Sequence, residues 1–149
     1  MTRVSVIKHE FVDSIPAELV EGTLYISIRY ATAVHRCCCG CGEEVVTPLT
    51  PTDWSLTYDG DTVSLDPSIG NWSLACRSHY WIGRNQIRWA QPWSEARIAA
   101  GRDRDRRAKR QYYGEHRPAS PLKGDAETQQ QSHERAGIRS RLARAFRGS

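Results

Sequence analysis

The sequence predicts a mainly β fold, a small antiparallel β-domain followed by a basic C-terminal tail. Short runs rich in aromatic and β-branched residues alternate with turn residues over residues 1–90. Four of the five tryptophans also fall in this part. The charge then changes sign along the chain. Residues 1–90 carry 7 Lys and Arg against 10 Asp and Glu, whereas residues 91–149 carry 14 against 7.

The expected strands follow one another closely, with β-prone positions at Val4, Val6 and Phe11 before them. A capped turn or single helical turn is expected at 14–19, where Pro16 is tolerated. Asp59-Gly60 between two alternating runs predicts a hairpin, and 66–72 has the composition of a loop. The main strands, about seven in number, are expected at residues 23–28, 33–35, 44–47, 54–58, 62–65, 79–82 and 86–89.

All five cysteines lie in two clusters, which read His35-Arg-Cys-Cys-Cys-Gly-Cys-Gly42 and Cys76-Arg-Ser-His79. Thiolate and imidazole are the ligands that zinc selects, and four of them close a tetrahedral structural site. Cys38-x-x-Cys41 and Cys76-x-x-His79 give the spacing CxxC…CxxH, which predicts zinc as the cofactor. A disulfide framework and a reactive cysteine activated by neighbouring arginines remain as alternatives.

Composition places the boundary between two parts near residue 92. Residues 1–92 form the expected zinc-binding β-domain, small enough for a structural metal to matter. Residues 93–149 form a basic tail, helical or disordered, in which Ser94 could cap a helix and residues 133–146 have a basic amphipathic pattern. No run is apolar enough to span a membrane, and no secretory signal is evident, so a cytoplasmic location is expected.

The same region offers residues for acyl-transfer chemistry. Ser68 or Ser78 would be the nucleophile and His79 or His35 the base. Ser78 and His79 are adjacent on a strand and would face opposite ways, so Ser68 with His79 is the better geometric pair. Asn71, or main-chain amides near Gly70, would stabilise an oxyanion. A metal with an open position could instead activate water.

The ordered motifs resemble one bacterial family over about residues 10–90. They are Gly-Thr-Leu-Tyr-Ile-Ser at 22–27, His35-x-Cys-x-Cys-Gly-Cys-Gly42, Val-Thr-Pro-Leu at 46–49, a run from Val63 to Trp72, and Cys76-Arg-Ser-His-Tyr-Trp-Ile82. The family is described as a domain of unknown function and is often encoded beside ubiquitin-like proteins and homologues of ubiquitin-activating and conjugating enzymes. The resemblance implies a role in a bacterial ubiquitin-like conjugation pathway.

The family pattern also bears on the metal ligands. It stresses Cys37, Cys39 and Cys41 rather than Cys38, which implies that these three and Cys76 close a four-thiolate site and leave His79 free. The alternative, in which a histidine (His35 or His79) is a ligand, stays open.

Two classes of function follow. The first is a peptidase that processes ubiquitin-like precursors or conjugates. The second is a non-enzymatic zinc module that docks the ubiquitin-like protein or its activating and conjugating enzymes. Nucleic acid binding through the tail ranks below both, because no recognition motif accompanies the charge.

Overall fold

The computed structural model describes residues 2–115, which form eight strands and one helix. Its contacts divide the chain into one compact unit, Met1–Tyr112, and a second from Tyr113 onward. The amphipathic stretch expected at 133–146 lies outside the described residues. Within residues 2–115, no helix is both long and apolar enough to cross a membrane.

The first four strands form one sheet in the order β1-β2-β3-β4. They are β1 (Lys8–Phe11), β2 (Thr23–Ser27), β3 (Thr32–Arg36) and β4 (Glu44–Pro48). β1 runs parallel to β2, and the other pairs are antiparallel. The turn between β3 and β4 carries the first cysteine cluster. Gly40 and Gly42 have φ of 88° and 82° there, a conformation that favours glycine and closes the turn.

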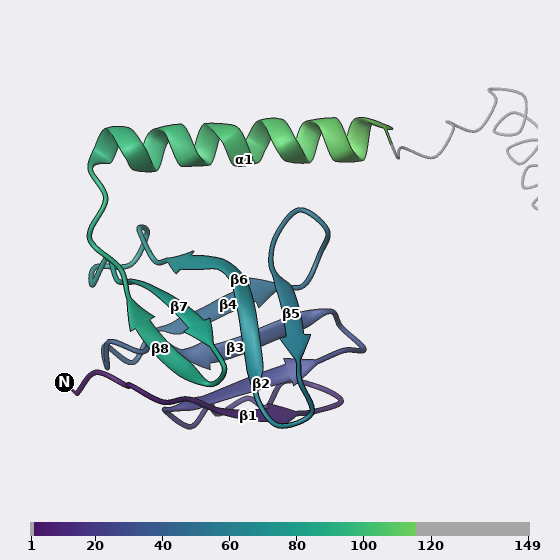
Figure 1. Cartoon of the computed structure of the whole chain (residues 1–149), viewed down its shortest axis with the longest axis vertical. Helices are drawn as coiled ribbons and strands as arrows, with labels where there is room; N and C mark the ends of the chain where they lie inside the picture. The colour runs from purple at the N-terminus through teal and green to yellow at the C-terminus, as the bar shows by residue number, and fades with distance from the viewer. Residues whose placement is uncertain (1, 116–149) are drawn as a thin grey trace, which may run out of the picture. The chain divides into compact units, whose positions relative to one another are not determined.

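The next four strands form an antiparallel sheet in the order β5-β6-β7-β8. They are β5 (Ser55–Tyr58), β6 (Val63–Gly70), β7 (His79–Gly83) and β8 (Gln86–Trp89). Both sheets contribute to one buried core (Figure 1), and the residues at its centre include Leu24, Ile26, Val63, Tyr80 and Ile82. The mainly β fold class is therefore confirmed.

Two local predictions were wrong. Residues 14–19 contain bends and no helical turn. Ile15 and Leu19 pack with Tyr25 and Val34 in a small second cluster. Residues 66–70 were expected in a loop but continue β6. An irregularity between Leu65 and Ile69 accommodates them, since β6 holds more residues than β7 over this stretch.

The helix α1 (Glu95–Glu115) follows β8 after a short connection. Ser94 caps it as expected, because the Arg97 N–H donates to Ser94 Oγ at 3.3 Å. In the first unit α1 lies across one side of the strands (Figure 1). Ile98, which is 3% exposed, is its buried anchor. The predicted boundary at residue 92 falls in the connection that precedes α1.

Candidate active site and thiol cluster

The side chains of Ser68 and His79 meet on the outer face of the β6–β7 ladder. Ile69 pairs with Tyr80 and Gly70 pairs with His79 in antiparallel register. Successive side chains of a strand alternate between faces, so Ile69 and Tyr80 enter the core. Ser68 and His79 then share the other face, and their Oγ and Nε2 atoms lie 2.9 Å apart.

The tautomer of His79 is set by its second nitrogen. Nδ1 lies 3.3 Å from the main-chain oxygen of Gln91, and a carbonyl oxygen only accepts hydrogen bonds. Nδ1 therefore carries the hydrogen, and Nε2 is left to accept the hydroxyl proton of Ser68. The Ala90 N–H donates to the His79 carbonyl at 2.9 Å, which holds this segment beside β7. The arrangement has the geometry expected of a nucleophile, a base and a group that orients the base.

Three tryptophans surround the imidazole of His79, and this residue is only 5% exposed. Trp72 and Trp93 contact it edge-on, each with ring centroids 5.0 Å away, and Trp81 lies tilted at 5.5 Å. Trp72 and Trp93 also stack on each other at 5.7 Å. This packing fixes the position of the ring and keeps water away from one side of it.

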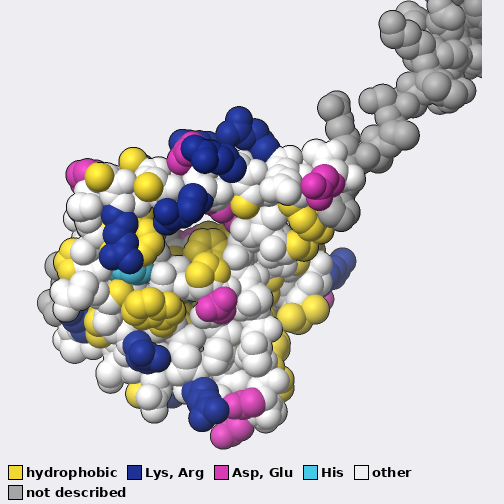
Figure 2. All heavy atoms as spheres, turned by 45° about the horizontal axis from the view of Figure 1, so that its top comes forward, with side chains coloured by type: hydrophobic (Ala, Val, Ile, Leu, Met, Phe, Trp, Pro, Cys, Tyr) yellow, Lys and Arg dark blue, Asp and Glu magenta, His cyan; other side chains and the backbone are white. Residues whose placement is uncertain are grey.

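A cleft of about 460 Å³ opens over the Ser68–His79 pair. β6 forms its floor, Trp72 and Trp93 form walls, and residues 98–105 of α1 border it on the opposite side. Figure 2 shows this face hollowed, with hydrophobic side chains inside and side chains of both charges at its rim. The volume lies in the range of ligand-binding pockets.

Asn71 is not brought to this pair. Its amide nitrogen lies 2.9 Å from Ser78 Oγ and 3.5 Å from Tyr80 Oη, on the other side of the strand. The prediction of Asn71 as an oxyanion donor therefore has no support in the geometry. Ser78 likewise faces the thiols, with its Oγ 3.0 Å from Cys37 Sγ, so its hydroxyl is separated from the cleft.

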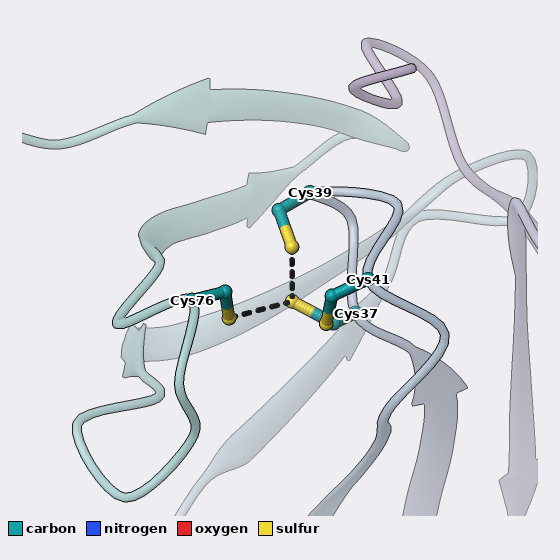
Figure 3. Close-up of side chains that lie close together, drawn as sticks. All are labelled: Cys37, Cys39, Cys41 and Cys76. Atoms are coloured by element: carbon teal, nitrogen blue, oxygen red, sulfur yellow. Dashed lines mark hydrogen bonds between the residues drawn. The ribbon is translucent and has the colours of Figure 1, made fainter. Parts of the chain in front are cut away.

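Four thiols converge at the turn between β3 and β4 (Figure 3). The sulfurs of Cys37, Cys39, Cys41 and Cys76 all lie within 4.8 Å of one another. Cys37 Sγ is 3.4 Å from Cys39 Sγ and 3.8 Å from Cys76 Sγ. Tetrahedral zinc–sulfur bonds of about 2.3 Å place neighbouring sulfurs ~3.8 Å apart. The cluster therefore has the donor set and spacing to hold a metal ion.

The ionisation of the thiols reflects their surroundings. Burial raises the pKa of Cys39 and of Cys41. Burial also acts to raise the pKa of Cys76, but hydrogen bonds from Ser78 and from the neighbouring thiols outweigh it and bring the value to about 7. Cys76 is thus more ready than Cys39 or Cys41 to become a thiolate ligand.

The remaining candidates for metal ligation lie outside this group. Cys38 is buried, and burial raises its pKa to about 12. His35 is fully buried with Nε2 2.8 Å from Tyr80 Oη, and burial lowers its pKa to about 4. His79 points to Ser68. Neither histidine contributes to the thiol group within residues 2–115.

Sequence reasoning missed the contributions of Gln91 and α1. Gln91 acts through a main-chain carbonyl, which leaves no signal in the residue type. Trp93 and part of α1 border the cleft. They reach it because the chain reverses direction after β8. The tryptophan content was the available signal, but tryptophan is more often a packing residue than a marker of a site.

Fold and site together define a small, thiol-rich β-domain that carries a serine–histidine pair. Residues 11–90 match the family model described as bacterial ubiquitination-like system serine protease (BubE). The match covers more than half of the chain, and the protein belongs to this family, which is associated with bacterial ubiquitin-like conjugation systems. No curated protein and no solved structure matches the chain.

Proposed function

We propose that this protein is a serine peptidase that cleaves precursors or conjugates of a ubiquitin-like protein in a bacterial conjugation pathway. The observation that carries the proposal is the 2.9 Å contact between Ser68 Oγ and His79 Nε2 at the floor of a cleft. The family description supports the reaction class and the pathway. The Nδ1 contact to the Gln91 carbonyl supports His79 as a base of fixed tautomer.

The reaction is acyl transfer in two stages. Ser68 Oγ attacks the scissile carbonyl carbon while its proton passes to His79 Nε2, which forms a carbon–oxygen bond and an oxyanion. The carbon–nitrogen bond then breaks, and His79 returns the proton to the leaving amine. Water, deprotonated by His79, attacks the resulting ester, and the carbon–oxygen bond to Ser68 breaks to release the acid and restore the hydroxyl.

The oxyanion requires a donor other than Asn71. Main-chain N–H groups of β6 beside the nucleophile are the remaining predicted donors. The Gly70 amide is the one we assign, because Gly70 borders the same cleft as Ser68 and His79. One such donor contributes on the order of 3 kcal/mol to transition-state stabilisation in a serine protease.

Zinc in the thiol cluster has a structural role in this proposal. Cys37, Cys39, Cys41 and Cys76 would hold it as thiolates, with no position for water. When bound, the ion supplies a cross-link between the β3–β4 turn and the segment that precedes β7. Since Cys76 is three residues before His79, this cross-link fixes the start of the strand that carries the base.

The test is an incubation of the purified protein with a ubiquitin-like protein of a bacterial conjugation system, followed by intact mass. We expect release of a C-terminal fragment, or of the amine-linked target, at one defined bond. Ser68→Ala should abolish the cleavage. Ser55→Ala, an exposed serine of β5 in the same sheet, is the matched control and should leave it unchanged.

Binding of the ubiquitin-like protein by wild type and Ser68→Ala alike, without any cleavage, would refute the peptidase assignment. That result would identify the protein as a docking module. Loss of cleavage in Ser55→Ala to the same extent as in Ser68→Ala would show that the assay reports folding rather than the nucleophile.

A further inference from the structure

The strand that carries Ser68 lacks a neighbour on one side at the position of the cleft. The ladder between β5 and β6 ends at the pair Ser55–Asp66, whereas β6 continues to Gly70. Over its last residues β6 therefore pairs only with β7, at Ile69–Tyr80 and Gly70–His79. An unpaired strand edge presents main-chain donors and acceptors to whatever lies beside it.

The register fixes which main-chain groups face this edge. The Asn71 N–H donates to the Ser78 carbonyl, and the Ala90 N–H donates to the His79 carbonyl. Ser78 therefore directs its carbonyl to β6, and His79 directs its own to the β8 side. In an antiparallel ladder these directions alternate from residue to residue. Gly70, opposite His79, consequently turns its N–H and C=O away from β7 and toward the unpaired edge.

The space beside this edge is continuous with the Ser68–His79 pair. Gly70 borders the cleft that contains both side chains, and it also borders a second cavity of about 230 Å³ next to β4. A side chain at position 70 is excluded, because a Cβ there would lie 2.5 Å from Trp72 Nε1. Glycine thus allows the indole to lie directly over the main chain.

α1 limits what can reach the edge. On one side of the cleft, Arg102 contacts Ser73 in the loop after β6 at 3.4 Å. Farther along the helix, the Lys109 ammonium lies 2.8 Å from the Asp53 carboxylate, just before β5. The helix therefore spans the end of β6 from the loop that follows it to the loop that precedes β5. The cleft beneath the helix, about 460 Å³, has the volume for a short polypeptide segment and not for a folded domain.

We infer that the substrate docks as an added β-strand on the free edge of β6 beneath α1. The Gly70 N–H then donates to the scissile carbonyl, and the Gly70 carbonyl accepts a main-chain N–H of the substrate. The inference rests on the proposed peptidase function and names its substrate class, an extended polypeptide segment recognised through its main chain. Strand addition is a recurring mode of peptide recognition in which main-chain hydrogen bonds supply affinity. It also places a main-chain carbonyl of the substrate beside the nucleophile on the same strand.

The test uses a synthetic peptide that spans the cleavage point mapped by intact mass, with single N-methyl groups placed at successive residues other than the scissile amide. N-methylation removes one donor and leaves the side chains unchanged. We expect kcat/KM to fall about tenfold or more at the one residue whose N–H faces the Gly70 carbonyl. The residues on either side of it should tolerate the methyl group.

Three other outcomes would overturn the inference. A flat profile, with the unmodified peptide cleaved, would exclude strand pairing and leave the peptidase assignment intact. Cleavage of the intact ubiquitin-like protein but not of the peptide would place recognition outside the cleft. Cleavage of neither substrate would remove the proposed function, and this inference with it.

Discussion

The thiol cluster and the Ser68–His79 pair lie on opposite sides of the same two strands. Ser78 turns its hydroxyl to Cys37, and the next residue, His79, turns its ring to Ser68. Directly after β6, the same alternation sends the Asn71 side chain to Ser78. One side is a group of sulfurs that could hold a metal, and the other borders the cleft that contains Ser68 and His79. We therefore expect the thiol cluster to support the fold and the Ser68–His79 pair to carry the chemistry.

The two regions also differ in how they are assembled. Three of the four converging sulfurs come from one turn, so the chain brings them together locally. Ser68 and His79 meet only through the register of β6 against β7 and the irregularity in β6. A defect in the first region should therefore destabilise the domain. A defect in the second should remove reactivity and leave the fold intact.

Loss of the metal should have the largest effect. A structural zinc contributes on the order of 10 kcal/mol in small zinc domains, comparable with a whole free energy of unfolding of about 5–15 kcal/mol. Cys37→Ser, or treatment with a strong chelator, should release zinc and abolish the cooperative thermal transition. Elemental analysis and differential scanning calorimetry measure the two effects.

Cys38→Ala is the matched control for that experiment. Cys38 is adjacent and equally buried, but it lies outside the sulfur group. It should keep one zinc per chain and lose about 1–2 kcal/mol of stability from the buried atom removed. A metal-free wild type with an unchanged melting temperature would show that the cluster has no structural role.

Substitution of His79 should remove activity and leave zinc binding unchanged. In His79→Gln, kcat/KM should fall by about 10³-fold or more, because nucleophile and base act as a unit. Zinc content should stay at the wild-type level, since His79 bonds to Ser68 and not to the cluster. A double variant with Ser68→Ala should be no slower than either single variant. Loss of zinc from His79→Gln would show that His79 is a metal ligand. It would then belong with the thiol cluster and not with Ser68.

Substitution of Trp93, which packs on His79, should have a smaller effect on catalysis. It lies beyond the residues that match the family, yet its ring packs edge-on against His79 at 5.0 Å. Trp93→Ala should lower kcat/KM by about 10- to 100-fold, because the imidazole loses one of its packed neighbours and moves out of line. Trp93→Phe keeps an aromatic ring there and should recover most of the rate. Equal rates for all three proteins would show that Trp72 and Trp81 suffice to hold the ring.

The sequence was a better guide to one region than to the other. Clustering of the cysteines indicated a thiol group, but the spacing alone pointed to Cys38 and His79. The family resemblance supplied Cys37 and Cys39 in their place. Asp59-Gly60 predicted the β5–β6 hairpin, because that signal is local. The end of β6 was mistaken for a loop because Pro67 and Gly70 are turn-forming residues. A proline is tolerated there because Pro67 lies in the irregular stretch between Leu65 and Ile69, where the regular ladder to β7 is interrupted.

The candidate site depended on contacts that residue types do not encode. Ser68 and His79 could be paired in advance only by assuming strand alternation. The same alternation turned Asn71 away, which proximity in sequence had not suggested. The carbonyl of Gln91 has no side-chain signature, and α1 borders the cleft only because the chain reverses after β8.

The β5–β6 hairpin offers a reference point remote from both regions, and it should give the smallest effect. Asp59 accepts hydrogen bonds from the Thr62 N–H at 2.6 Å, the Thr62 hydroxyl at 2.7 Å and the Asp61 N–H at 2.9 Å. These bonds, led by that from the Thr62 N–H, lower the pKa of Asp59 to about 2 from its ordinary 3.8. A depressed carboxyl pKa stabilises the folded state above the ordinary value, and this stabilisation is lost as the pH falls toward 2.

Asp59→Asn isolates this contribution because the amide oxygen still accepts main-chain hydrogen bonds but does not titrate. Wild type should melt slightly above Asp59→Asn at pH 6, and the difference should shrink between pH 4 and pH 2, the window set by the two pKa values. Thermal melts of both proteins across that range measure it. Zinc content and cleavage rate at pH 7 should be identical in the two. A difference in melting temperature that does not change with pH would show that Asp59 does not titrate as described. A change in cleavage rate or zinc content would show that the hairpin is linked to the Ser68–His79 pair or to the thiol cluster.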